Sequence, residues 1–338
     1  MDNKSNKKKY EWFASGNAPV LFPTELASGD FILEDMSKIS IPISLPFATT
    51  WGQPASKQLL PENDHPAPKF VLITWLSMVE KKFYIAADEL PIKQIETLLA
   101  EKNEKTDEPK YNTIVAGMAP YGNLAIWLSG NGIVTEVAYL QGKEMAVNMK
   151  DFAPKSKLTL EEYATQALEK CKEAHKNFQD NNLPDPLLFE RYMQKFNYRI
   201  SPKFEYEKTQ LEKIELFYYN GELDTTNSGQ HTKNTMRAKP YKIALHWSAD
   251  RLLYSAYFWT DETKIIETFA NFYDDDTQKE GELIIEVGKS NKDFKLMLKD
   301  DSTMIEIPVE DIEIIVFKSK FEFFKSKNYK RPPNGWNS

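Results

Sequence analysis

Histidine and cysteine are the side chains most often recruited for metal binding and nucleophilic chemistry, and this sequence has few of them. The four histidines, His65, His175, His231 and His246, are scattered, and no two have the spacing of a zinc site on a helix or a β-ribbon. His246 lies beside Trp247 in a strand-like run and is interpreted as a hydrogen-bonded or edge residue, and His231 lies in a polar loop. The sequence therefore predicts no metal centre and no cofactor.

Gly288, Lys289 and Ser290 spell the last three residues of a phosphate-binding loop. That motif needs a glycine five positions before Gly288, where this chain has Leu283, and a helix after it, where the strand-like run FKLML follows. These residues are therefore interpreted as a turn between strands. The motifs GxSxG and HExxH do not occur either, so the sequence carries no recognisable catalytic set and predicts a protein that is not an enzyme.

Two loops are candidates for contact with a partner. The acidic run Asp274, Asp275 and Asp276 follows a predicted helix but lacks the alternating ligands and the glycine of a calcium loop, so we interpret it as a solvated loop suited to a basic partner. A second turn, Pro120, Tyr121, Gly122 and Asn123, joins two predicted strands. Because loops on a rigid β-scaffold usually carry recognition, we expect both loops to be exposed and to contact a protein.

The net charge of the chain indicates which class of partner to expect. The net charge is -7 over 338 residues and the pI is near 5.4, which argues against nucleic acid and favours a protein with a basic surface. Charged residues make up 28% and no apolar run is long enough to span a bilayer, so we expect no transmembrane segment. Cys171 lies on the apolar stripe of a predicted helix and is interpreted as a small buried hydrophobe.

The start of the chain allows two interpretations of its location. Residues 1–10 are polar and contain Lys7, Lys8 and Lys9. They do not have the pattern of a secretion signal, which favours the cytoplasm. They also look like the tether of a mature lipoprotein whose signal peptide and lipidated cysteine were removed, which favours a lipid anchor and the periplasm or outer membrane.

The apolar pattern predicts strands grouped around two amphipathic helices, after Pro91 and over residues 263–270, with a longer helix over residues 159–180. Thr159 and Glu162 have the spacing of a capping box at the start of that longer helix. We divide the chain into a disordered polar tail (1–9), a first β-rich unit (10–150), a helical connector (151–184), a second β-rich unit (185–325) and a C-terminal tail (326–338).

An internal repeat relates the two units. The run KFVLITW ending at Trp75 matches YKIALHW ending at Trp247, and the helices IKQIETLL and TKIIETFA align with Ile95 on Ile266. The runs that follow agree in apolar pattern and turn position at a nearly constant offset. This predicts an α+β fold made of two tandem ββαβββ-like units related by internal duplication. Trp75 and Trp247 are then expected to be buried core residues, in preference to a platform for a ligand.

Several aromatic and turn motifs carry a resemblance to a known family. They are YEW at residues 10–12, Trp51 with Gly52, WLSMVEKKFYIAADELP at residues 75–91, IVAGMAPYGNLAIWL at residues 114–128 and YNGE at residues 219–222. With them the chain resembles the domain-of-unknown-function family 2931, which is found largely among Gram-negative bacterial lipoproteins. The resemblance covers most of residues 10–140 and patches of the second half, and it offers no active residues to carry over.

The resemblance implies a function in protein binding. Some members of that family sit beside secreted lipase-type toxins, which would make them immunity proteins. The leading hypothesis is therefore a non-catalytic protein that neutralises a co-encoded secreted toxin. The rival is a periplasmic or surface lipoprotein that binds a small ligand or glycan, and a third alternative is an uncharacterised hydrolase.

Overall fold

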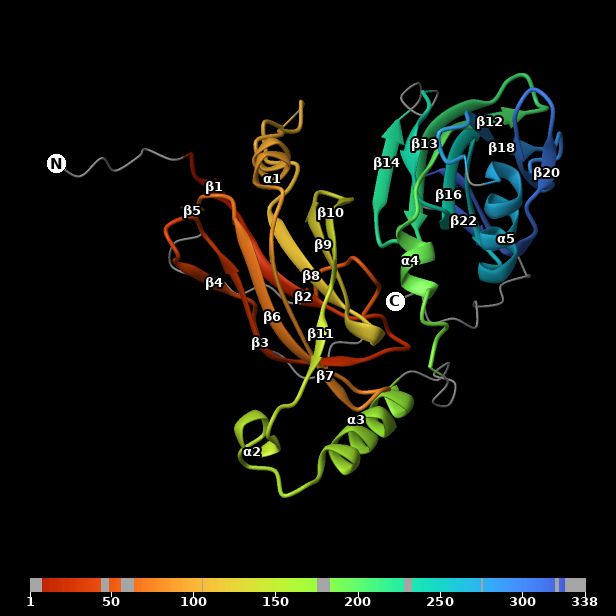
Figure 1. Cartoon of the computed structure of the whole chain (residues 1–338). Helices are drawn as coiled ribbons and strands as arrows, with labels where there is room; N and C mark the ends of the chain where they lie inside the picture. Colours follow the sequence, from red (N-terminus) through yellow and green to blue (C-terminus); the bar gives the residue numbers. More distant parts are fainter. Residues whose placement is uncertain are drawn as a thin grey trace. The chain divides into compact units, whose positions relative to one another are not determined.

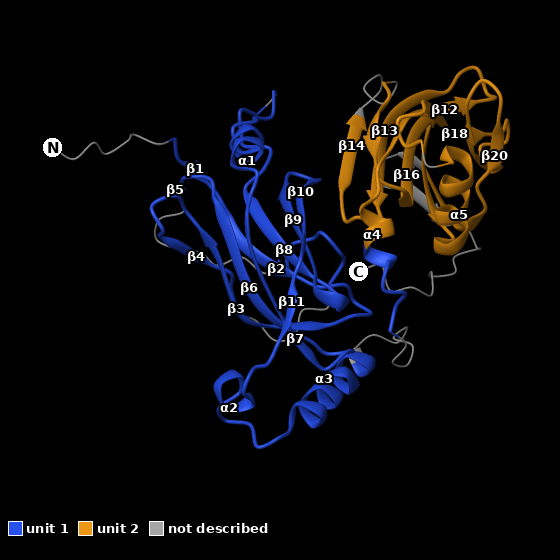
Figure 2. Ribbon diagram, viewed as in Figure 1, with its two compact units in different colours: residues 1–189, 333–338 blue, residues 190–332 orange. Residues whose placement is uncertain are grey.

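The computed structural model describes residues 8–43, 49–55, 64–104, 106–174, 183–227, 233–274, 276–319 and 322–325, with the backbone alone from residue 317 onward. The chain forms two compact units (Figure 2). Unit 1 is Met1–Phe189 with Pro333–Ser338, and unit 2 is Glu190–Pro332. Strands outnumber helices in both (Figure 1), so the α+β class is confirmed. Among the described residues, no helix has the length and apolar character needed to cross a membrane.

Unit 1 contains a five-stranded antiparallel sheet in the order β11-β7-β6-β3-β4. Its strands are β3 (Thr24–Ile32), β4 (Lys38–Ser40), β6 (Phe70–Ser77), β7 (Lys82–Glu89) and β11 (Lys143–Met145). A β-bulge lies in β3 between Leu26, which pairs with Trp75, and Ser28. Such a bulge shifts the alternation of side chains by one residue, so that both ends of β3 keep their apolar side chains towards the core.

The second sheet of unit 1 pairs β2 (Phe13–Asn17), β8 (Thr113–Met118), β9 (Asn123–Gly130) and β10 (Ile133–Gln141) in that order, with β2 parallel to β8. The apolar core contains side chains of both sheets, among them Ile73, Trp75, Ile114 and Ile126. Helix α1 (Ile92–Leu99) follows β7 and buries Ile95 and Leu99 in the same core. The strands β1 (Tyr10–Glu11) and β5 (Asp64–His65) form a separate ribbon.

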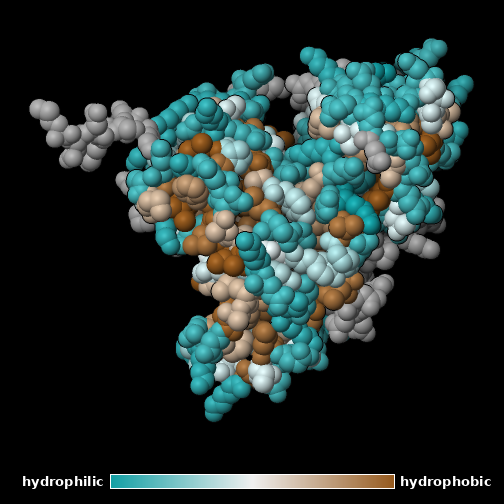
Figure 3. All heavy atoms as spheres, viewed as in Figure 1, coloured by the Kyte–Doolittle hydropathy of each residue, from teal (hydrophilic) through white to brown (hydrophobic). Residues whose placement is uncertain are grey.

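Helices α2 (Met149–Phe152) and α3 (Leu160–Ala174) cover the outer face of the five-stranded sheet. Ala164 and Leu168 pack with Leu76, Met78 and Phe83 in a second core. In Figure 3 hydrophobic side chains appear between these helices and the sheet, and the outer surface of the helices is hydrophilic. The predicted capping box is confirmed, because the Glu162 carboxylate accepts from the Thr159 N–H at 2.8 Å and the Thr159 hydroxyl accepts from the Glu162 N–H at 3.3 Å.

Unit 2 also contains two sheets. The first has the order β14-β13-β16-β17-β21-β22, and the second has the order β15-β12-β18-β19-β20 with β12 parallel to β18. The strands are β12 (Phe196–Phe204), β13 (Gln210–Tyr218), β14 (Leu223–Asn227), β15 (Thr235–Arg237), β16 (Pro240–Ala249), β17 (Leu252–Thr260), β18 (Gly281–Val287), β19 (Phe294–Lys299), β20 (Met304–Glu306), β21 (Val309–Ser319) and β22 (Glu322–Lys325). Helix α4 (Leu188–Met193) contains the residue at which the two units divide, and α5 (Glu262–Tyr273) packs on β12 through Phe269.

Trp75 and Trp247 are both fully buried, as predicted. Trp75 packs on Tyr84 of the next strand with ring centroids 5.7 Å apart, and Trp247 stacks on Tyr254 at 5.2 Å. Counted from their N-caps, the two helices place their buried residues at the same positions, one residue away from the pairing of Ile95 with Ile266 made on the sequence. The N-caps are Pro91 and Asp261, and the buried positions Ile95 and Leu99 of α1 correspond to Ile265 and Phe269 of α5.

Candidate functional site

The turn Pro120–Asn123 is folded into unit 1 and is not an exposed loop. Pro120, Gly122 and Asn123 are buried, and Tyr121 is half-buried. The expectation of an exposed loop is therefore wrong for three of the four residues. The cause is the 3₁₀ turn η1 (Pro120–Gly122), which brings β8 directly into β9 and closes with a hydrogen bond from the Asn123 amide to the Pro120 carbonyl oxygen.

Tyr121 has a left-handed backbone, with φ of 60°, which is unfavourable for a residue with a side chain. Two neighbours hold it there. Its N–H donates to the Glu80 carboxylate at 2.8 Å, and its carbonyl oxygen accepts from the Gln141 amide at 2.5 Å. Its hydroxyl donates to the carbonyl oxygen of Pro184 at 3.0 Å. The polar groups of this turn therefore serve the fold, and the side chain of Tyr121 keeps only partial access to solvent.

The acidic loop after α5 is exposed where it is described. Asp274 ends the helix in a left-handed conformation, and the Asp276 carboxylate accepts from the Gln278 N–H at 3.1 Å. Asp275 lies outside the described residues, as do His175 and His231. Within the described ranges, no group of three or more His, Cys, Asp or Glu side chains is placed to hold a metal ion.

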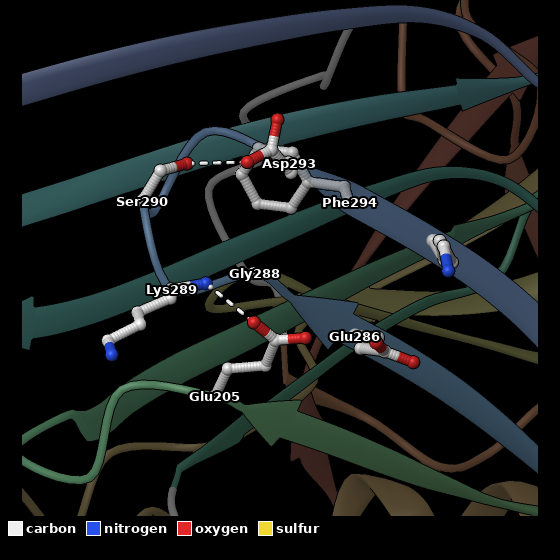
Figure 4. Close-up of a pocket in the computed structure, with 8 residues that line it drawn as sticks. Glu205, Glu286, Gly288, Lys289, Ser290, Asp293 and Phe294 are labelled. Carbon is white, nitrogen blue, oxygen red and sulfur yellow. Dashed lines mark hydrogen bonds between the residues drawn. The ribbon is translucent and has the colours of Figure 1, made fainter.

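A pocket of about 450 Å³ lies beside the β18–β19 hairpin of unit 2 (Figure 4). Its lining includes Gly288, Lys289 and Ser290, the residues that resemble the end of a phosphate loop. The Lys289 N–H donates to the Glu205 carboxylate at 3.0 Å, and the Ser290 hydroxyl donates to the Asp293 carboxylate at 2.7 Å. The bond between Ser290 and Asp293 closes the hairpin turn, as the interpretation of a turn between strands expects. The bond from Lys289 to Glu205 ties this turn to the end of β12, so these groups are already used within the fold.

The outer face of the first sheet of unit 2 carries a different cluster. We use the term unit 2 face for the side chains that point away from the core there: Glu215 and Phe217 of β13, Lys242 and His246 of β16, and Tyr257 and Trp259 of β17. The Lys242 ammonium lies over the rings of Phe217, Tyr257 and Trp259, at 4.9, 5.3 and 5.3 Å from their centroids. Partial burial lowers the pKa of Lys242, and the three rings supply cation–π attraction in return.

His246 joins three strands of this face by hydrogen bonds. Its Nδ1 lies 2.8 Å from Ser255 Oγ on β17, and its Nε2 lies 3.2 Å from Glu215 Oε2 on β13. The other carboxylate oxygen of Glu215 accepts from Lys213 Nζ at 2.8 Å. The hydrogen bond from His246, aided by Lys213 and opposed by partial burial, lowers the pKa of Glu215 from 4.5 to about 2. Glu215 is therefore a carboxylate at neutral pH.

Two further reactive side chains, Lys239 and Cys171, lie outside this cluster. Lys239 is 1% exposed, and burial lowers its pKa to about 7. Its ammonium donates to the carbonyl oxygen of Arg191 at 2.6 Å and lies over the ring of Phe196, so its contacts are those of a residue that ties α4 to the core of unit 2. Cys171 is half-buried on α3, and burial raises the pKa of its thiol, which disfavours the reactive thiolate.

Comparison with known proteins places unit 1 in a family. The sequence matches the family model described as a protein of unknown function (DUF2931) over residues 1–185 of the 338. No curated protein and no solved structure matches the chain. The resemblance seen in the motifs between residues 10 and 128 is therefore confirmed, and the chain belongs to the DUF2931 family; the motif YNGE at residues 219–222 lies outside the match.

Proposed function

We propose that unit 2 is a diverged second copy of unit 1. The strand pairings support this. The chain order β2, β3, β4, β6, β7, α1, β8, β9, β10, β11 of unit 1 has a counterpart in β12, β13, β14, β16, β17, α5, β18, β19, β20, β21 of unit 2. Corresponding strands pair with corresponding neighbours in the same direction, including the parallel pairs β2–β8 and β12–β18.

Irregular features recur at the same places, which a shared apolar pattern alone does not explain. In unit 1 the bulge of β3 follows Leu26, the partner of Trp75; in unit 2 the bulge of β13 follows Leu211, the partner of Trp247. Each tryptophan also packs on a tyrosine of the next strand, Tyr84 or Tyr254. A bulge is a feature that families retain, so its recurrence supports duplication.

The divergence between the copies suggests where the protein acts. In unit 1 the positions after Trp75 and before Tyr84 are Leu76 and Phe83, and both are buried beneath α3. In unit 2 the corresponding residues are Ser248, which is hydrogen-bonded to Glu212, and Leu253, which is 45% exposed. At these two positions unit 2 therefore lacks the buried apolar side chains on which a covering helix could pack. It has aromatic and charged side chains elsewhere on the same face.

We therefore propose that the unit 2 face binds a protein partner and that the protein acts by occluding that partner. The observation that carries the proposal is the array of Phe217, Lys242 and Tyr257 on the outer face of the sheet, beyond the end that α3 covers in unit 1. Aromatic side chains such as Tyr257 are enriched in the hot spots of protein interfaces. The partner proposed is a co-encoded secreted toxin with a basic surface, because the chain is acidic overall and opposite charges speed association.

The test is a pull-down with the secreted protein encoded by the neighbouring gene, followed by a toxicity assay with and without this chain. Tyr257→Ala should weaken binding by about tenfold or more, as expected for a buried interface aromatic. The matched control is the double variant Asp274→Ala with Asp276→Ala, which alters the exposed acidic loop and leaves the unit 2 face intact.

The two sets of variants separate two contact surfaces. Loss of affinity in the loop variant alone would return the contact to the acidic loop and overturn the assignment to the unit 2 face. Absence of both binding and protection would overturn the immunity function. A ligand that occupies the pocket at Gly288–Ser290 in a thermal-shift screen would then favour the rival, a lipoprotein that binds a small ligand or glycan.

A further inference from the structure

The hydrogen bonds around His246 have a direction that follows from charge. Glu215 is ionised at neutral pH and can only accept, so His246 Nε2 must carry the proton that joins them. In a neutral imidazole the other nitrogen, Nδ1, is then an acceptor. The hydroxyl of Ser255, 2.8 Å away, therefore donates to Nδ1. The three groups form a directed relay in which a serine hydroxyl faces a base that is itself oriented by a carboxylate.

We infer that Ser255 is a nucleophile and that the unit 2 face reacts with carboxylic and phosphonic esters through the relay Ser255–His246–Glu215. The arrangement has the parts of acyl-transfer sites: a hydroxyl, an imidazole within hydrogen-bond reach and a third group that fixes the imidazole. It differs in that Nδ1, and not Nε2, faces the serine. The ring of Tyr257, with its centroid 6.0 Å from that of His246, gives an apolar group a surface beside the hydroxyl.

The chemical step balances without any further reactant than water. The Ser255 oxygen forms a bond to the carbonyl carbon of the ester while its proton moves to His246 Nδ1. The bond to the leaving alkoxide breaks, and the alkoxide takes that proton and departs as an alcohol. Water then attacks the acyl-serine, gives a proton to Nδ1, and the acid leaves as the serine recovers its hydroxyl proton.

The position of Ser255 sets the rate. The residue is 8% exposed and lies within β17, which is paired on both sides by β16 and β21. Backbone N–H groups in such a strand are used by the sheet and are not free to stabilise an oxyanion. We therefore expect covalent labelling and slow turnover, because the relay activates the nucleophile but the strand supplies no oxyanion donors.

The experiment treats the full chain with a fluorophosphonate probe and locates the adduct by mass spectrometry. Attack on phosphorus expels fluoride and leaves the phosphonyl group on Ser255 Oγ. The expected result is a single adduct on Ser255. His246→Asn should slow its formation by about 100-fold, within the usual range for loss of a general base. Glu215→Gln should slow it by about tenfold, because an amide orients the imidazole without its charge.

Ser248→Ala is the matched control. Ser248 lies on β16 and its hydroxyl is hydrogen-bonded to Glu212 at 2.8 Å, so it pairs with a carboxylate without an intervening imidazole. The variant should label as the parent does.

Three results of the labelling experiment would each contradict the inference. No adduct on the wild-type chain, an adduct on Ser248, or labelling that is indifferent to His246→Asn would overturn the inference. None of these outcomes bears on partner binding, which is measured separately, so the two proposals fail independently.

Discussion

Trp75 and Trp247 occupy the same position in the two units but differ in one hydrogen bond. Trp247 Nε1 donates to the buried side-chain oxygen of Asn291 at 2.9 Å, whereas Trp75 Nε1 is buried and has no partner among the described residues. Replacement by Phe leaves a similar cavity at each site but strands the Asn291 oxygen only in unit 2. We expect Trp247→Phe to cost about 1–3 kcal/mol more than Trp75→Phe in urea unfolding. Equal costs would show that Asn291 finds another donor.

Of the contacts made by His246, the one with Ser255 could be predicted from the sequence and the one with Glu215 could not. Asp250 and Arg251 both have positive φ, as a two-residue hairpin turn requires, and that turn places His246 opposite Ser255. The contact was therefore accessible from the sequence once the turn was located. Glu215 was not, because its position beside His246 depends on the bulge in β13, which is specified by tertiary packing.

At the scale of elements, α3 should detach from the sheet without unfolding unit 1, because Ala164 and Leu168 belong to the small core beneath the helix and not to the main one. Leu168→Glu would bury an unpaired carboxylate there and cost about 2–4 kcal/mol of docking energy. We expect trypsin to cut at Lys170 and Lys172 at least about tenfold faster, with near-UV circular dichroism nearly unchanged. The control Gln166→Glu changes an exposed position of the same helix. Collapse of the near-UV signal would show that α3 is integral to the fold.

The elements that sequence patterns predicted well are those with regular periodicity. The helix after Pro91, the capping box at Thr159 and the strands around Trp75 and Trp247 were all found at their places. Strand β3 is hard to predict from the sequence, because its bulge interrupts the alternation and because Ser28, Gly29 and Asp30 are residues typical of a turn. The run PVLFP (19–23) has a strand-like apolar pattern, but the Phe22 N–H bonds to the Pro19 carbonyl oxygen in a turn.

At the scale of the whole molecule, the family model matches only the first part of the chain, whereas the fold pattern of that part recurs in the second. The family model covers residues 1–185, whereas the pairing scheme of unit 1 recurs over residues 196–319. Strand order and bulge position outlast sequence identity, since many side chains satisfy one apolar pattern. The two units share a pairing scheme and differ on the outer face of one sheet, which is the pattern that the proposed duplication, with a new contact on one copy, would produce.

If the two units fold independently, a substitution that unfolds one of them should leave the other folded. Ile95 of α1 and Ile265 of α5 occupy equivalent, fully buried positions in the two units. An aspartate at either position places an unpaired charge in one core, at a cost of several kcal/mol. In the full chain, Ile95→Asp should abolish hydrogen-exchange protection in β6, β7, β8 and β9 and leave β16, β17 and β18 protected, and Ile265→Asp should do the reverse. Simultaneous loss of protection in both units after either substitution would mean that the two units unfold as one cooperative body, and the proposed binding by unit 2 would then depend on the integrity of unit 1.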